Sequence, residues 1–286
     1  MHGIDLSIFA TLIADPRLPF GMGAAMLSGL VRGFAGFGSA LIYIPLMSTI
    51  YDPKIAVMSF LPTDLLTGTV YAVRLRQLVS WREVLPMAVA AAITIQFGAL
   101  LLEYADPTTL RWTITGMVAF ALPLLISGWR YQVRPSMALN IGVGLFSGLI
   151  GGAVQIAGPP ILLYWLGSMH PSSVVRASIM AFFTIFTIVS IITYVAHGLM
   201  TFESIAICVF LVPMYIIAMW IGAYLYKRAS EQTYRRIAYV IIAVSAIIGA
   251  PVLDRYLRPQ PPPQKTGESV QPPVPDNRML SSLNRD

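Results

Sequence analysis

Six long stretches of this chain are apolar and, apart from Asp64, have charged residues only at or next to their ends: residues 54–76, 83–103, 111–129, 177–202, 204–226 and 237–253. The hydrocarbon core of a bilayer is about 30 Å thick, and an α-helix needs about 20 apolar residues to cross it. Each stretch meets or approaches that length. Membrane β-strands would instead alternate in polarity over about ten residues. The sequence therefore predicts an all-α polytopic integral membrane protein.

The composition explains why lipid must be the solvent. Of the 286 residues only 11% are charged and 56% are hydrophobic, whereas a soluble domain has about 25% charged residues. The net charge of +6 does not indicate a nucleic-acid partner, because the basic residues lie singly or in small groups between apolar stretches, where they set orientation. The lone cysteine, Cys208, excludes an internal disulfide and argues against a thiolate metal site. We expect no cofactor and no metal.

The chain also contains an internal repeat of about 120 residues. "SGLVRG" at 28–33 returns as "SGLIGG" at 147–152, and "FGALLLEYADPTTLR" at 97–111 aligns with "IGAYLYKRASEQTYR" at 221–235. Repeats of this kind are typical of proteins built from duplicated structural units. The sequence thus predicts two similar halves that meet near residues 131–138.

Loop charges indicate that the two halves are inverted. The loop at 74–82 carries three arginines and its counterpart at 197–203 carries no Lys or Arg, whereas the acidic loop at 103–110 corresponds to the basic loop at 227–236. Because cytoplasmic loops are rich in Lys and Arg, equivalent loops face opposite sides. The cytoplasmic loops are then 74–82, 130–134, 168–176 and 227–236, and both termini lie outside.

An inverted repeat needs an odd number of crossings per copy, and each half has three clear spans. We therefore expect each half to begin with a re-entrant or short-helix hairpin of two half-length helices. A single broken helix in its place would contradict the loop charges. The predicted organisation is an interfacial N-terminal segment at 1–18, membrane repeats at 19–131 and 132–257, and a disordered Pro-rich tail at 258–286.

The turns of the two hairpins are the candidate binding site. They are "LVRGFAGFGSALIYIP" at 30–45 and "GGAVQIAGPPILLYWL" at 151–166. Irregular backbone at membrane depth is tolerated where it lines a cavity, and half-helix N-termini there attract anions. The candidate substrate-binding residues are Arg32, Gly33, Gly36, Phe37, Gly38, Ser39, Gln155, Gly158 and Pro159.

Two ionisable residues in these apolar surroundings have a functional and a structural interpretation. The planar guanidinium of Arg32 suits carboxylate, sulfonate or sulfite oxygens; alternatively Arg32 pairs with Asp64 and ties the hairpin to the next span. Asp64 is a candidate for proton coupling, because removal from water disfavours its charged form; alternatively it is a structural counter-ion. We expect Ser39 to cap the helix that follows it, and Gly158 to begin another, since proline suits the first turn.

With these residues identified, the chain resembles the TauE/SafE sulfite exporter family, also called the toluene-sulfonate uptake permease family. The resemblance covers about residues 20–256 and rests on "GFAGFGSALIYIP" followed by "DPKIAV", and on "GLIGGAVQIAGPPILLYWL". It implies a multi-pass transporter of the bacterial plasma membrane for sulfite, sulfonates or similar small anions.

Three other functions are compatible with parts of the sequence. A passive anion channel shares every feature above, as does a transporter of a non-sulfur organic anion. A scaffolding membrane subunit would leave Arg32 without a role. An enzyme is not expected, because the chain shows no phosphate loop, no metal-ligand cluster and few His or Cys residues. The expected partners are a small anionic substrate and the bilayer, with a homo-oligomer possible.

Overall fold

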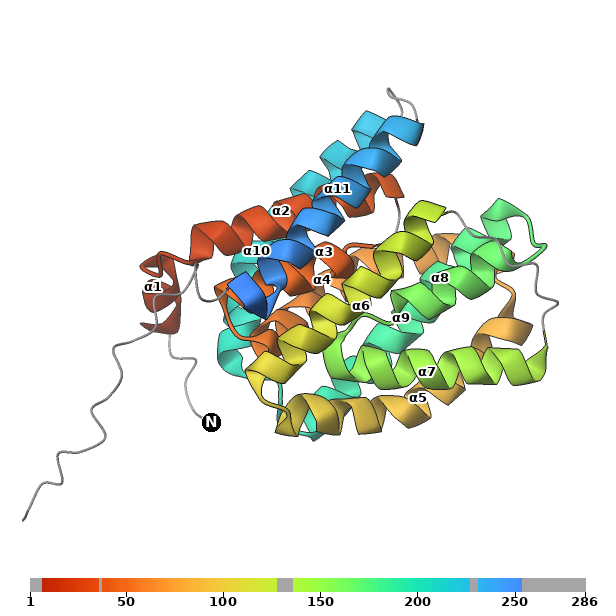
Figure 1. Cartoon of the computed structure of the whole chain (residues 1–286), viewed down its shortest axis with the longest axis horizontal. Helices are drawn as coiled ribbons and strands as arrows, with labels where there is room; N and C mark the ends of the chain where they lie inside the picture. The colour runs from red at the N-terminus through yellow and green to blue at the C-terminus, as the bar shows by residue number, and fades with distance from the viewer. Residues whose placement is uncertain (1–6, 36–37, 128–135, 227–230, 254–286) are drawn as a thin grey trace, which may run out of the picture. The chain divides into compact units, whose positions relative to one another are not determined.

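The structure is a computed structural model that describes residues 7–35, 38–127, 136–226 and 231–253. In these residues it contains helices and connecting turns and no strands (Figure 1). The helices are α1 Ser7–Ile13, α2 Leu18–Ala35, α3 Ala40–Ile50, α4 Pro53–Leu75, α5 Trp81–Tyr104, α6 Pro107–Ser127, α7 Met137–Val154, α8 Gly158–Gly167, α9 Ser172–Ala196, α10 Phe202–Tyr226 and α11 Glu231–Gly249, with 3₁₀ turns at Arg76–Leu78 and Pro251–Leu253. The predicted disordered tail, the loop at 130–134, and Gly36 and Phe37 lie outside the described residues.

Within the described residues, six helical segments are long and apolar enough to cross a membrane. They are Pro53–Leu78, Trp81–Tyr104, Pro107–Ser127, Met137–Val154, Ser172–Ala196 and Phe202–Leu225. Five of them fall on predicted spans, with ends shifted by a few residues. The predicted span at 237–253 is not among them, because the apolar part of its helix, Arg236–Gly249, is shorter than the other six. Pro251 follows two residues later and disfavours helical backbone at Ala250.

The hairpins differ from the prediction of two half-length helices. Their first helices, α2 and α7, each have 18 residues, whereas the second helices have 11 in α3 and 10 in α8. At 1.5 Å per residue, 18 residues extend about 27 Å, which is close to the thickness of the hydrocarbon core. The glycine-rich sequences suggested earlier breaks, but Gly33 and Gly152 lie inside helices.

The order of long and short helices occurs twice, once in α2–α6 and once in α7–α11. The packing of the helices follows the same correspondence. Helix α2 packs against α10 and α7 packs against α5, while α4 and α9 pack against each other. The contact of α2 with α10 thus corresponds to the contact of α7 with α5, and the contact of α4 with α9 joins two corresponding helices.

Repeated glycines explain why α2 and α10 lie so close together. A Cβ atom at Gly29 would overlap the carbonyl oxygen of Tyr215, and one at Gly33 would overlap that of Met219. The absence of a side chain at these two positions lets the helix backbones touch, as in other membrane helix pairs with small residues four apart.

The second half repeats this contact between α7 and α5. A Cβ atom at Gly148 would overlap the carbonyl oxygen of Ala91, and one at Gly152 would come too close to that of Ile95. Gly148 and Gly152 in "SGLIGG" occupy the same positions as Gly29 and Gly33 in "SGLVRG". The most visible sequence repeat therefore marks a helix-packing contact.

The chain turns back between α2 and α3. The Ser28 hydroxyl, on α2, donates a hydrogen bond of 3.0 Å to the carbonyl oxygen of Ser39, so the beginning of α3 lies beside the last two turns of α2. In the second half, Gly151 near the end of α7 is in close contact with Ala157, just before α8. Both breaks bring the beginning of a short helix into the protein interior.

Candidate functional site

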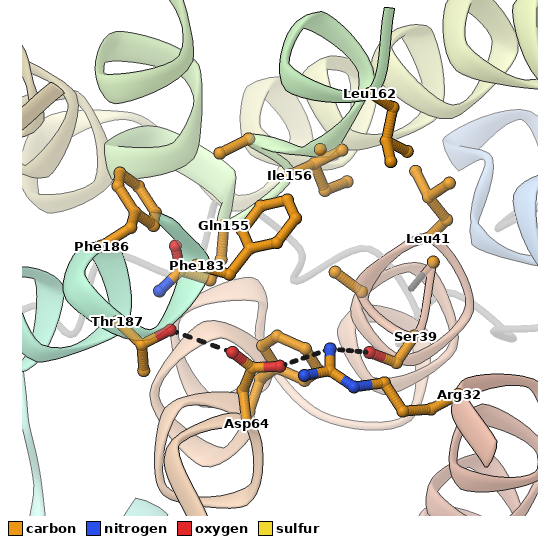
Figure 2. Close-up of a pocket in the computed structure, with 15 residues that line it drawn as sticks. Arg32, Ser39, Leu41, Asp64, Gln155, Ile156, Leu162, Phe183, Phe186 and Thr187 are labelled. Carbon is orange, nitrogen blue, oxygen red and sulfur yellow. Dashed lines mark hydrogen bonds and ion pairs between the residues drawn. The ribbon is translucent and has the colours of Figure 1, made fainter. Parts of the chain in front are cut away.

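A cavity of about 50 Å³ lies where these two breaks meet the middle parts of α4 and α9 (Figure 2). One water molecule needs about 10–15 Å³ on the same measure, so the cavity has room for a small solute. The predicted site residues that line it are Arg32, Gly38, Ser39, Asp64, Gln155 and Gly158. The structure therefore brings together residues from both candidate motifs.

Both halves contribute a phenylalanine and a polar residue to the cavity. Helix α4 supplies Phe60 and Asp64, four residues apart, and α9 supplies Phe183 and Thr187 with the same spacing. A spacing of four places both members of each pair on one helix face. The cavity thus lies between the halves, with its ionic groups on one side only.

Arg32 is the positive group of the cavity. Its Nη1 atom lies 2.7 Å from Oδ1 of Asp64 and donates a 3.2 Å hydrogen bond to the hydroxyl of Ser39. The side chains of Arg32 and Asp64 are only 11% and 7% exposed. Arg32 stands in the last turn of α2, where the helix dipole favours a cation. The structure therefore contains the ion pair that was the structural interpretation of both residues, and the formal charges of the pair cancel.

Asp64 uses its second oxygen to reach the other half of the protein. Its Oδ2 atom accepts a 3.0 Å hydrogen bond from the hydroxyl of Thr187 on α9. Figure 2 shows the resulting line of contacts from Thr187 through Asp64 and Arg32 to Ser39. The carboxylate therefore connects α4 both to α2 and to α9.

Gln155 ends α7 in an unusual conformation. Its φ angle is 57°, in the left-handed region where glycine is the common residue, and its N–H bonds to the carbonyl of Gly151. Its side chain lines the cavity, the residue is 6% exposed, and neither amide atom has a hydrogen-bond partner among the described residues. An unpaired buried polar group costs about 1–3 kcal/mol, so this amide is available to a ligand or to water.

The beginnings of the short helices only partly match the expectation. Helix α8 begins at Gly158 as predicted, but Pro159 and Pro160 follow and carry no N–H, so its first turn offers fewer amide donors than an ordinary helix. At α3, Ser39 occupies the capping position without a capping hydrogen bond. That prediction was wrong because the Ser39 hydroxyl accepts from Arg32 instead.

Other predicted residues lie elsewhere. Gly33 is in the contact between α2 and α10 described above, which accounts for the absence of a side chain there. Pro159 is not among the residues that line the cavity. Gly151, which corresponds to Arg32 in the repeat, packs against the ring of Phe186. In the second half, the ring of Phe186 therefore lies beside the position that Arg32 occupies in the first half.

Sequence reasoning missed Thr187 and the aromatic walls of the cavity. A local spacing carries a signal for them, since "FLPTD" at 60–64 and "FTIFT" at 183–187 both place a polar residue four positions after a phenylalanine. Thr187 attracts no notice by itself, because threonine is common in membrane helices, where it bonds to its own backbone.

Comparisons with known proteins agree with the geometry. The family described as "Sulfite exporter TauE/SafE" matches residues 21–248, which run from α2 into α11. The chain is also 25% identical over 194 residues to the "Probable sulfite/organosulfonate exporter TauE" of Cupriavidus necator, covering 63% of this chain and 73% of that protein. No solved structure matches the chain. The chain therefore belongs to the TauE/SafE sulfite exporter family and is a multi-pass membrane transporter.

Proposed function

We propose that the chain is a secondary transporter of sulfite or small organosulfonates that binds the anion in the cavity between the two halves. The observation that carries the proposal is the buried pair of Arg32 and Asp64 in a cavity lined by both helix breaks. An intramembrane charge is costly and is by default functional. The name of the Cupriavidus necator relative, a sulfite/organosulfonate exporter, supports this class of substrate.

The bound anion takes the place of Asp64 beside Arg32. Its remaining oxygens are within the reach of the Ser39 hydroxyl, the N–H of Gly158 and the unpaired amide of Gln155, all of which face the cavity. Apolar walls from Phe60 and Phe183 accommodate the organic part of a sulfonate. The guanidinium offers two parallel donors to two oxygens of a sulfite or sulfonate group.

Charge balance links binding to a proton. With Asp64 ionised, the pair is neutral, and an added monoanion would leave a net negative charge in a medium of low dielectric constant, which is unfavourable. Protonation of Asp64 removes its charge and frees Arg32 for the substrate. One monoanion and one proton then occupy the site together, and the direction of net transport follows from their two gradients.

The proposed topology is a pair of inverted repeats. The matching helix order and the paired contacts of α2 with α10 and of α7 with α5 support a duplication, and the loop charges support the inversion. Inverted repeats place a shared site between the two copies near the bilayer midplane. The cavity between α4 and α9 is the candidate for that site.

The test is uptake of labelled anions by purified protein in proteoliposomes. The panel contains sulfite, sulfate, sulfoacetate, isethionate and a carboxylate, each measured at two internal pH values. We expect uptake of sulfite or a sulfonate that accumulates against its gradient when the pH gradient drives proton movement in the same direction.

Two results would contradict the proposal in different ways. Uptake that never exceeds equilibrium at any pH gradient indicates a passive anion channel. Selective uptake of the carboxylate indicates a non-sulfur organic anion as the substrate.

A further inference from the structure

Thr187 differs from the other buried hydroxyl residues near it in where its hydrogen bond goes. On the same helix, Thr184 donates to the carbonyl oxygen of Met180 at 2.9 Å, and Ser190 donates to that of Phe186 at 2.8 Å. These are the usual bonds of a helical Ser or Thr to the carbonyl four residues earlier. Thr187 instead donates to Asp64 on α4.

The same contrast holds on α4. Thr63 donates to the carbonyl oxygen of Ser59 at 3.2 Å, and Thr67 donates to that of Thr63 at 3.0 Å. The hydroxyl of Thr187 thus has a local alternative in its own helix, the carbonyl of Phe183. It is drawn across the helix boundary by an ionised acceptor, since hydrogen bonds to charged groups are stronger than those to neutral ones.

Thr187 follows Phe183 on α9 with the same four-residue spacing that separates Asp64 from Phe60 on α4, and all four residues line the cavity. Its bond to Asp64 crosses the interface between the two halves. Among the described residues, the charged or titratable groups near Asp64 are Arg32 from α2, whose Nη1 lies 2.7 Å from Oδ1 of Asp64, and the buried Tyr215 from α10. From Ser178 to Thr193, the sequence of α9 contains no ionisable residue.

We propose that Thr187 is the positioning residue through which the charge of Asp64 controls the contact between the two halves. When Asp64 is ionised, Thr187 donates to it and α9 is held against α4. When Asp64 takes up a proton, the acceptor loses its charge and the hydroxyl turns to the carbonyl of Phe183, which releases this link between the halves. Movement of one half against the other thereby depends on the protonation of Asp64. This inference rests on the proton-coupled transport proposed above.

The test compares two fluxes of labelled sulfite in proteoliposomes that contain the full chain. One is downhill uptake at equal pH on both sides, and the other is accumulation driven by a pH gradient. Thr187→Val preserves the shape of the side chain and removes the hydroxyl. We expect the ratio of driven accumulation to downhill uptake to fall about tenfold relative to wild type, as loss of a bond to a charged group implies. Thr187→Ser restores accumulation.

Thr184→Val is the matched control, because it removes a hydroxyl one turn away that bonds to its own helix. We expect it to keep the wild-type ratio of accumulation to downhill uptake. The inference is overturned if Thr187→Val keeps that ratio, if it lowers both fluxes equally, or if Thr184→Val lowers the ratio as much. None of these results affects the proposed function. Failure of the wild type itself to accumulate sulfite overturns the proton coupling and this inference together.

Discussion

The Nη1 atom of Arg32 on α2 lies 2.7 Å from Oδ1 of Asp64 on α4, and both side chains are almost completely buried. The second half of the protein has Gly151 where the repeat aligns with Arg32, so the architecture of a half does not require an ion pair there. Replacing a buried ion pair by apolar residues often leaves stability unchanged or increases it. The pair is therefore better explained by binding and coupling than by stability.

Substitution of Arg32 by glutamine should abolish sulfite uptake. The variant loses the guanidinium that binds the anion. It also leaves Asp64 buried without its ionic partner, and breaking a buried pair in this way lowers the free energy of unfolding by up to about 3–5 kcal/mol. The double variant Arg32→Gln/Asp64→Asn contains no unpaired charge and should regain most of the thermal stability but not the uptake. Thermal unfolding in detergent and proteoliposome uptake measure the two effects. Uptake by the folded single variant would assign Arg32 a structural role.

Asp64→Asn should separate transport from coupling. The asparagine keeps the size of the side chain and cannot exchange a proton, while Arg32 remains free to bind an anion. Downhill uptake should therefore persist, and accumulation driven by a pH gradient should disappear. A variant that still concentrates sulfite with the pH gradient would exclude Asp64 as the coupling group.

The sequence predicted much of this site and less of the hairpin geometry. Charge is rare in lipid, so Arg32 and Asp64 were conspicuous, and their pairing was one of the two interpretations left open. The lengths of α2 and α7 were not predictable in the same way, because glycine inside a membrane helix and glycine at a turn look alike in one sequence. Only the partner helix, whose backbone touches Gly33 or Gly148, distinguishes the two cases.

Gln155 should contribute to substrate affinity through its side-chain amide. Its left-handed backbone makes Gln155→Gly the informative substitution, because glycine accepts this conformation without strain and removes the side chain together with its amide. We expect the KM for sulfite to rise about fivefold, which corresponds to the loss of one hydrogen bond of about 1 kcal/mol, while thermal stability is kept or increased. An unchanged KM would mean that the amide meets water and not the substrate.

The glycine contacts can be tested on one helix. In α7, a Cβ atom at Gly148 would overlap the backbone of α5, whereas one at Gly142 would meet nothing within 4 Å. Gly148→Ala should lower stability by about 1–3 kcal/mol, as overpacking does. Gly142→Ala should be neutral or stabilise by up to about 1 kcal/mol, because alanine favours the helix. Equal melting temperatures for the two variants in detergent would contradict the packing of α5 against α7.

The inverted topology predicts that two corresponding loops lie on opposite sides of the membrane. Gln77 follows α4 in the arginine-rich loop and Met200 follows α9 in its uncharged counterpart. Single cysteines at these positions, in a Cys208→Ala background, can be labelled in intact cells with a reagent that does not cross membranes. Cys208 is buried, so its removal takes away an inaccessible thiol. We expect labelling at 200 in intact cells and labelling at 77 only after permeabilisation, because the three arginines around residue 77 hold that loop in the cytoplasm. Labelling of both positions under the same condition would place the two loops on one side, and the two halves would then share one orientation.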